Sequence, residues 1–181
     1  GVMRVSASMP SVSVTAEAST RGCAAIARVG RSSSHSAGSD DVALVLRGGS
    51  SDELSSSFNR EQVNVIVSAP GIQRDALGPV ASPEFYTIVD LPMRSTGTAA
   101  NVPFRGVTSR ATDVRTGFRM VAGRMFEPGK DEVIVGRGAF AQFGNVDLGR
   151  EVKWGSHLWR VVGVFEAGGS ISESEVWTDL T

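Results

Sequence analysis

Short runs of hydrophobic residues, separated by turn-forming residues, divide most of the chain into segments of strand length. Residues 42–46 are continuously apolar and end at Gly48-Gly49, a pattern typical of a buried strand. Further along, apolar residues alternate with polar ones or gather in short stretches bounded by glycine. Gly97 predicts a turn between two such stretches, and Gly155-Ser156 predicts a hairpin. The pattern predicts strands at residues 86–91, 101–107, 118–122, 132–135, 151–154, 158–165 and 176–177.

Two segments have the pattern of short helices. Ser50 and Glu53 have the spacing of a capping box, so a helix is predicted to begin there. It is predicted to end before Pro70-Gly71, because the residue before a proline is disfavoured in helical conformation. The β-branched residues within 63–67 leave a strand there as an alternative. A second helix is predicted within residues 136–144.

Residues 1–40 are predicted to be a poorly packed segment and linker, with most of residues 1–30 packing weakly. They are rich in serine and show no sustained hydrophobic period. Val12 and Val14 alternate with serines, which would suit one short edge strand. The packed domain is therefore predicted to occupy residues 41–181.

The composition suits a β-rich α+β domain without a nucleic-acid site. A chain of 181 residues with 41% hydrophobic residues can form one domain or two small lobes, and its 21 glycines favour many turns. The formal net charge is −1, from 18 basic and 19 acidic side chains, with no basic stripe, so we expect no nucleic-acid partner. Cys23 is the only cysteine and there are two histidines, so neither a disulfide nor a zinc site is expected.

The hydrophobic runs are too short to cross a membrane. The longest, at residues 42–46 and 161–165, fall far short of the roughly 18 to 20 residues that a spanning helix needs. The first residues also lack the pattern of a secretory signal. Because the chain opens on Gly1, we expect it to be a piece of a longer protein.

One motif is typical of a cofactor-binding turn. Residues 136–141 read G-x-G-x-x-A from Gly136 to Ala141 and follow a predicted strand, as in dinucleotide-binding proteins. The helix that follows is predicted to be too short to connect parallel strands, and no acidic residue stands where the ribose contact is expected. A small dinucleotide-binding enzyme therefore remains the alternative function, and we expect no cofactor.

Three other features are predicted to be structural. Residues 123–130 resemble a phosphate-binding loop but have the wrong glycine spacing, so a turn is predicted. Glu173 and Glu175 flank Ser174 on an apparent strand and are predicted to form a solvated edge. Trp154 and Trp159 flank the predicted hairpin turn and are expected to pair across its strands.

Several short stretches between about Asp41 and Asp179 carry a resemblance to a known family. They are residues 45–56, 81–84, 100–107, 121–129, 131–136, 142–144, 159–165 and 174–177. The segment at 121–129, for example, reads VAGRMFEPG. In the order and spacing of these stretches, the chain resembles the periplasmic core domain of MacB-type ABC transporter permeases, within the FtsX/MacB/LolC type.

The resemblance implies an extracytoplasmic domain inserted between transmembrane helices of a bacterial inner-membrane permease that works with a cytoplasmic ATPase. It implies an α/β lobe, assigned to residues 41–107 and 171–181, and a mainly β lobe at residues 108–170. It implies contact with a substrate, a lipoprotein or a periplasmic adaptor, and brings no catalytic residue. A free-standing secreted binding module remains a further alternative.

Four residues are the candidates for a partner interface or lobe boundary. Thr108, Ser109 and Thr112 are small, polar and follow Gly106, so the connection there could permit movement between lobes. Trp177 is a candidate because exposed tryptophans often lie at interfaces.

Overall fold

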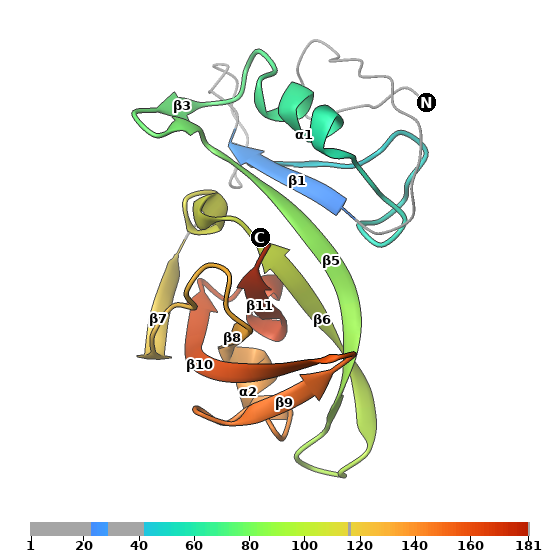
Figure 1. Cartoon of the computed structure of the whole chain (residues 1–181), viewed down its shortest axis with the longest axis vertical. Helices are drawn as coiled ribbons and strands as arrows, with labels where there is room; N and C mark the ends of the chain where they lie inside the picture. Colours follow the sequence, from blue (N-terminus) through green and yellow to red (C-terminus); the bar gives the residue numbers. More distant parts are fainter. Residues whose placement is uncertain (1–22, 29–41, 116, 181) are drawn as a thin grey trace. The chain divides into compact units, whose positions relative to one another are not determined.

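The computed structural model describes residues 23–28, 42–115 and 117–180, which form an α+β fold dominated by strands (Figure 1). This confirms the predicted fold class. The first of two compact units comprises the described residues up to Tyr86 together with residues 109–114. The second comprises residues 87–108 and the described residues from Arg115 onward. Across the described ranges, no helix has the length and hydrophobicity needed to cross a membrane.

An alanine-rich strand is the centre of the sheet in the first unit. Strand β1 (Cys23–Arg28) lies between β2 (Val42–Val45) and the start of β5 (Ala81–Pro92), antiparallel to both. Its residues Ala24, Ala25 and Ala27 are buried. The prediction of weak packing is therefore wrong for this strand, because a central strand of small residues shows no hydrophobic alternation. The strand predicted around Val12 and Val14 lies outside the described residues.

The first helix begins later than its sequence signal. Helix α1 (Arg60–Val67) starts at Asn59, whose side chain accepts a hydrogen bond from the Gln62 backbone N–H at 2.9 Å. The Gln62 side chain in turn accepts from the Asn59 backbone N–H, also at 2.9 Å, which completes a capping box. The box predicted at Ser50 is therefore wrong; that residue lies in a turn, where its hydroxyl donates to the Ser55 carbonyl.

The helix packs its apolar side onto the sheet of the first unit. Ile66 of α1 forms a small buried cluster with Ala25 of β1 and Val45 of β2, and Phe58 packs against it. This burial explains why the β-branched Ile66 is tolerated in a helix, since packing outweighs its weak helix propensity. A short hairpin of β3 (Arg74–Asp75) and β4 (Gly78–Pro79) follows.

The second unit is built on one mixed sheet in which β10 pairs with three other strands. The sheet continues from β5 to β6 (Ala99–Val107), β11 (Val176–Asp179), β8 (Glu132–Gly136), β10 (His157–Ala167) and β7 (Phe118–Gly123). Strand β9 (Glu151–Trp154) forms the predicted hairpin with the first half of β10. The second half of β10 pairs with β7, so β10 has partners along both of its sides.

Two pairs of strands in this sheet are parallel. β11 is parallel to β6, and β10 is parallel to β8. Helix α2 (Arg137–Gln142) is as short as predicted, yet the connection at residues 137–156 joins β8 to β10 as a crossover. The expectation that this segment could not connect parallel strands is therefore wrong, because the loop and β9 supply the length that the helix lacks.

The core of the second unit contains an aromatic cluster that the strand pattern did not reveal. Phe104 lies edge-on against both Trp154 and Trp159, with ring centroids 5.4 and 5.2 Å apart. The two tryptophans do not face each other across the hairpin, because Trp154 pairs with His157 and Trp159 with Val152. Their expected direct pairing is thus replaced by a shared contact with Phe104.

The two units do not follow the predicted lobes. Strand β11, assigned with residues 41–107, pairs with β6 and β8 inside the second unit. Residues 109–114, assigned to the mainly β lobe, belong to the first unit. The lobe boundaries at residues 107, 108, 170 and 171 stay a prediction.

Candidate functional site

A buried ion pair connects β6 to the segment before β11. Arg105 donates two hydrogen bonds to the Glu175 carboxylate, both 2.9 Å long, and both side chains are almost fully buried. The indole N–H of Trp177 donates to the same carboxylate at 2.7 Å. The prediction that Glu175 lies on a solvated edge is wrong, since parallel pairing of β11 with β6 places Trp177 opposite Arg105.

Trp177 offers no surface to a partner in this structure. Its side chain is fully buried. Its ring stacks on Phe118 and lies tilted against Phe165, with centroids 5.6 and 4.4 Å away, and the Arg115 guanidinium lies 4.5 Å from its ring centre. The expectation of an exposed interface tryptophan is therefore corrected: this residue packs β11 against β7 and β10.

The glycine-rich turn at residues 136–141 is filled by the chain's own backbone. A Cβ atom on Gly136 would lie 2.2 Å from the Glu173 carbonyl oxygen, and one on Gly138 would lie 3.0 Å from it. The short helix η2 (Ile171–Ser174) occupies the place where a pyrophosphate would approach. A carbonyl oxygen repels a phosphate, so this geometry contradicts the alternative of a dinucleotide-binding site.

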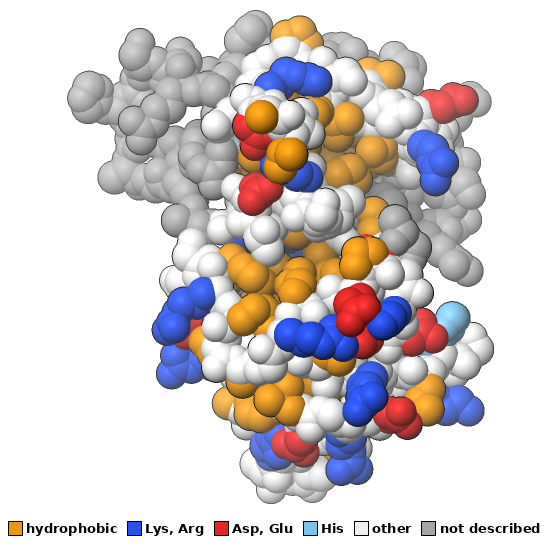
Figure 2. Space-filling model, turned by 60° about the vertical axis from the view of Figure 1, so that its left-hand side comes forward, with side chains coloured by type: hydrophobic (Ala, Val, Ile, Leu, Met, Phe, Trp, Pro, Cys, Tyr) orange, Lys and Arg blue, Asp and Glu red, His pale blue; other side chains and the backbone are white. Residues whose placement is uncertain are grey.

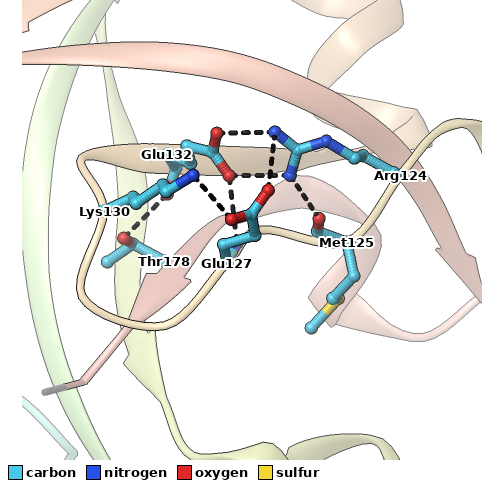
Figure 3. Close-up of polar contacts among 6 residues, drawn as sticks. All are labelled: Arg124, Met125, Glu127, Lys130, Glu132 and Thr178. Carbon is cyan, nitrogen blue, oxygen red and sulfur yellow. Dashed lines mark hydrogen bonds and ion pairs between the residues drawn. The ribbon is translucent and has the colours of Figure 1, made fainter.

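The loop that resembles a phosphate-binding loop is organised around Glu132 (Figure 3). Arg124 donates to both carboxylate oxygens of Glu132, at 2.7 and 2.6 Å, and the Glu127 backbone N–H donates to one of them at 3.0 Å. These bonds hold the pKa of the Glu132 carboxyl at about 2, well below its ordinary value. Lys130 pairs with Glu127 at 2.6 Å. The loop is thus a turn, as predicted, and its charges are paired internally.

An open groove of about 440 Å³ lies beside β7 in the second unit. Two guanidinium groups, a carboxylate and several apolar side chains share its surface. Its lining residues are Arg119, Met120, Val121 and Ala122 of β7, Arg137 and Phe140 of α2, and Val164 and Glu166 of β10. In Figure 2, where the side carrying β7 comes forward, hydrophobic side chains alternate with charged ones on this face.

Glu166 binds both arginines of the groove. Arg119 stands directly opposite Glu166 on the neighbouring strand and pairs with it through Nε. Arg137, at the start of α2, donates to the other carboxylate oxygen at 3.2 Å. Both arginine side chains are about two-thirds exposed, whereas that of Glu166 is 17% exposed. The groove therefore presents two positive groups that a single, partly buried carboxylate holds in place.

The three polar residues predicted at a boundary lie where the chain passes between the two units. Thr108 ends the segment of the second unit, and Ser109 begins the segment 109–114 of the first. Ser109 and Thr112 are the first and last residues of the short helix η1 (Ser109–Thr112). A role for them in movement or partner binding stays a prediction.

Sequence reasoning missed the charged residues that define the groove and the buried ion pair. Arg119 and Glu166 are 47 residues apart, and Arg105 and Glu175 are 70 apart. No local spacing indicates such pairs, because the order of the strands brings them together. Opposite charges on neighbouring strands are a signal only once the pairing of the strands is known.

The chain matches a family model over nearly its whole length. The model is described as the MacB-like periplasmic core domain and matches residues 12–181. The match begins well before Asp41, where the resemblance read from the sequence began. No curated protein matches.

Two solved structures are similar to the chain. One is the extracellular domain of a noncanonic ABC-type transporter, YknZ, from Gram-positive bacteria: 22% identity, TM-score 0.44, covering 68% of this chain and 63% of that one. The other is the periplasmic region of MacB from Actinobacillus actinomycetemcomitans: 14% identity, TM-score 0.46, covering 87% of this chain and 64% of that one. The chain thus spans a little under two thirds of the length of each.

Proposed function

The chain belongs to the family of MacB-like periplasmic core domains, and we propose that it is the extracytoplasmic domain of an ABC transporter permease. The match over residues 12–181 is the observation that carries this proposal. In this role the domain is not an enzyme. It recognises a substrate or partner protein and couples that recognition to ATP hydrolysis on the other side of the membrane.

The proposed partners follow from that role. The rest of the permease supplies the transmembrane helices, and a cytoplasmic ATPase supplies the energy. On the extracytoplasmic side of the bacterial inner membrane, the domain contacts the transported substrate, a lipoprotein or a periplasmic adaptor. Glu132 is paired with Arg124 and Glu175 with Arg105, each in the arrangement of a structural network.

Coupling requires that movements of the transmembrane helices reach the domain. We propose that the segments in which the chain passes from one unit to the other transmit these movements. The chain leaves the second unit after Thr108 and returns to it at Arg115. Two compact units joined by such crossings commonly move relative to one another. Thr108, Ser109 and Thr112 are then the residues whose backbone absorbs the movement.

Ser109→Pro in the full permease, assembled with its ATPase, tests this coupling. Proline is tolerated in the first turn of a helix, so η1 should form, while Ser109 and the preceding Thr108 lose backbone freedom. Spin labels at the exposed residues Leu77 of the first unit and Leu148 of the second report the distance between the units, with Cys23 replaced by alanine.

We expect the addition of ATP to shift the distance between the two labels in the protein with Ser109, and to shift it far less in the Ser109→Pro variant. Ser109→Ala, which removes the hydroxyl without restricting the backbone, serves as the matched control and should behave like the parent. Circular dichroism of the chain first checks that each variant is folded. An equal shift in the proline variant, or no shift in the parent, would contradict the proposed coupling.

A further inference from the structure

We propose that the groove beside β7 binds an extended segment of a partner protein in which a carboxylate stands next to an apolar side chain. The inference rests on the proposed function, since it assumes that the domain recognises another protein. It goes further by naming the surface and the chemistry of the segment that this surface takes.

The charged residues that line the groove favour binding of an anionic group. Two arginines and one carboxylate line it, so one positive charge is left over. Arg119 uses Nε, and Arg137 uses one terminal nitrogen, to bind Glu166. Within the described residues, the remaining nitrogen atoms of both guanidinium groups are left for a ligand. The Glu173 carboxylate lies outside the lining, accepts the backbone N–H groups of Ala167 and Gly169, and interacts with the charge of Arg137. A carboxylate from a partner would accept bidentate hydrogen bonds from the remaining guanidinium nitrogen atoms.

Glu166 makes the two arginines a prepared site. Long arginine side chains lose rotamer freedom when they bind a ligand, which weakens binding. Here one carboxylate, mostly shielded from solvent, already fixes both guanidinium groups. Binding of a ligand then costs less side-chain entropy. The groove can also distinguish ligands by their charge as well as by their shape.

The apolar part of the groove has a structural origin in a β-bulge. In the pairing of β7 with β10, Ala122 lies opposite Val164 and Met120 opposite Phe165, which leaves Val121 as an extra residue. Such a bulge re-aims a side chain. Val121 is 40% exposed and lines the groove together with Phe140, so an apolar side chain next to the ligand carboxylate would find contacts there.

The position of β7 favours a peptide over a lipid headgroup. Among the described strands, β7 is the last in the order of the sheet and pairs with β10 alone. An edge strand can hydrogen-bond an extended peptide through its backbone, whereas a lipid headgroup has no matching row of donors and acceptors. The groove and the edge together suit an extended segment that carries both a charge and an apolar group.

A selection of short random peptides on the immobilised 181-residue chain tests the proposal directly. We expect the selected peptides to be enriched in Asp or Glu next to an apolar residue. A labelled selected peptide is then compared with its counterpart in which Gln or Asn replaces the acidic residue, by fluorescence anisotropy. Loss of the carboxylate should raise the dissociation constant of the peptide about tenfold. A rise in ionic strength should also weaken the binding of the acidic peptide, because salt screens its charge.

The variants locate the binding in the groove. Arg119→Ala with Arg137→Ala should lower the affinity about tenfold or more, because both partners of the carboxylate are removed. The single variant Arg137→Gln, at an exposed position that leaves the Arg119–Glu166 pair intact, should lower it less. Arg150→Ala with Lys153→Ala removes the same charge outside the groove and should leave the affinity unchanged.

Three results would overturn the proposal: selected peptides without acidic residues, equal binding by the groove and control double variants, or binding of anionic phosphatidylglycerol vesicles but not of peptides. None of these three results would contradict the proposed role of the domain in a permease. That role is tested separately by the response of the spin labels to ATP, so failure of one idea can be told from failure of the other.

Discussion

At Gly136 the backbone leaves no room for a side chain, because the Glu173 carbonyl oxygen lies 2.2 Å from the place a Cβ would occupy. The contact explains why a turn with the glycine spacing of a cofactor motif is found in a domain of this family. The glycines let η2 approach the start of α2. Glycine permits close approach of another group both here and in a cofactor-binding turn. The two kinds of turn differ in the group that approaches: a backbone segment here, and a pyrophosphate in a cofactor-binding turn.

Gly136→Ala should lower the free energy of unfolding by about 1–3 kcal/mol, because a methyl group must displace a backbone carbonyl. Gly144→Ala is the matched control, since a Cβ there meets its nearest neighbour at 3.6 Å, an ordinary contact. Urea unfolding of both variants against the parent measures the difference. Equal stability of the two variants would show that η2 does not pack closely on Gly136.

Glu132 gives the domain a pH-dependent contribution to stability. Its folded pKa, about 2, lies below the ordinary value of 4.5. The stabilisation is therefore complete above about pH 4.5 and is lost as the pH falls towards 2. Because Arg124 is half exposed, we expect about 1–2 kcal/mol, less than the pKa difference alone would give.

Glu132→Gln should thus destabilise the chain near neutral pH and have a much smaller effect at about pH 3, where the parent carboxyl has lost part of its advantage. Glu127→Gln provides the comparison, since Glu127 is 53% exposed and its pairs with Lys130 and Arg124 are solvated. Urea unfolding at both pH values gives the free energies. A Glu132→Gln effect that is the same at both would rule out the ionised carboxylate as its cause.

Among the elements, helix α1 is one whose stability depends strongly on its N-terminal cap. It is eight residues long, too short to be stable alone, so its ends and its packing decide whether it forms. Asn59 and Gln62 satisfy each other's backbone N–H groups at its start. The packing of Ile66 on the sheet of the first unit supplies the rest.

Asn59→Ala should cost about 1 kcal/mol and speed the exchange of amide hydrogens in the first turn of α1, because the Gln62 N–H loses its acceptor. Asn59→Ser keeps an oxygen that can accept from the Gln62 N–H, so its exchange should stay near that of the parent. Hydrogen exchange read at residues 62 and 63 is the measurement. Unchanged exchange in the alanine variant would mean that packing alone holds the helix start.

How much of an element could be predicted depended on whether its signal was local. The hairpin of β9 and β10 was predicted because Gly155 stands between two strand-like stretches, and the turn is a property of neighbouring residues. Strand β1 was missed because its alanines are small and show no alternation of apolar and polar residues, and because the surrounding sequence is rich in serine. The start of α1 was misplaced because Ser50 and Glu53 satisfy the same short-range rule as Asn59 and Gln62, and only packing distinguishes them.

For the whole molecule, the fold class and the family could be predicted, whereas the arrangement of charges could not. The family resemblance rests on the order of many short stretches, which the sequence displays directly. The groove depends on Arg119, Arg137 and Glu166 meeting through the strand order and the crossover from β8 to β10. Such contacts between distant residues are set by topology and leave no mark on local periodicity.

The excursion of residues 109–114 into the first unit has a consequence for how the domain can be divided. A gene fragment for the second unit alone would include this segment, with Ala111 and Val114, which are fully buried in the intact chain. Removing the segment would leave Thr108 and Arg115 to be rejoined. Neither unit is therefore a contiguous module that recombination could exchange on its own, and chimaeras of this domain should be made by swapping both units together.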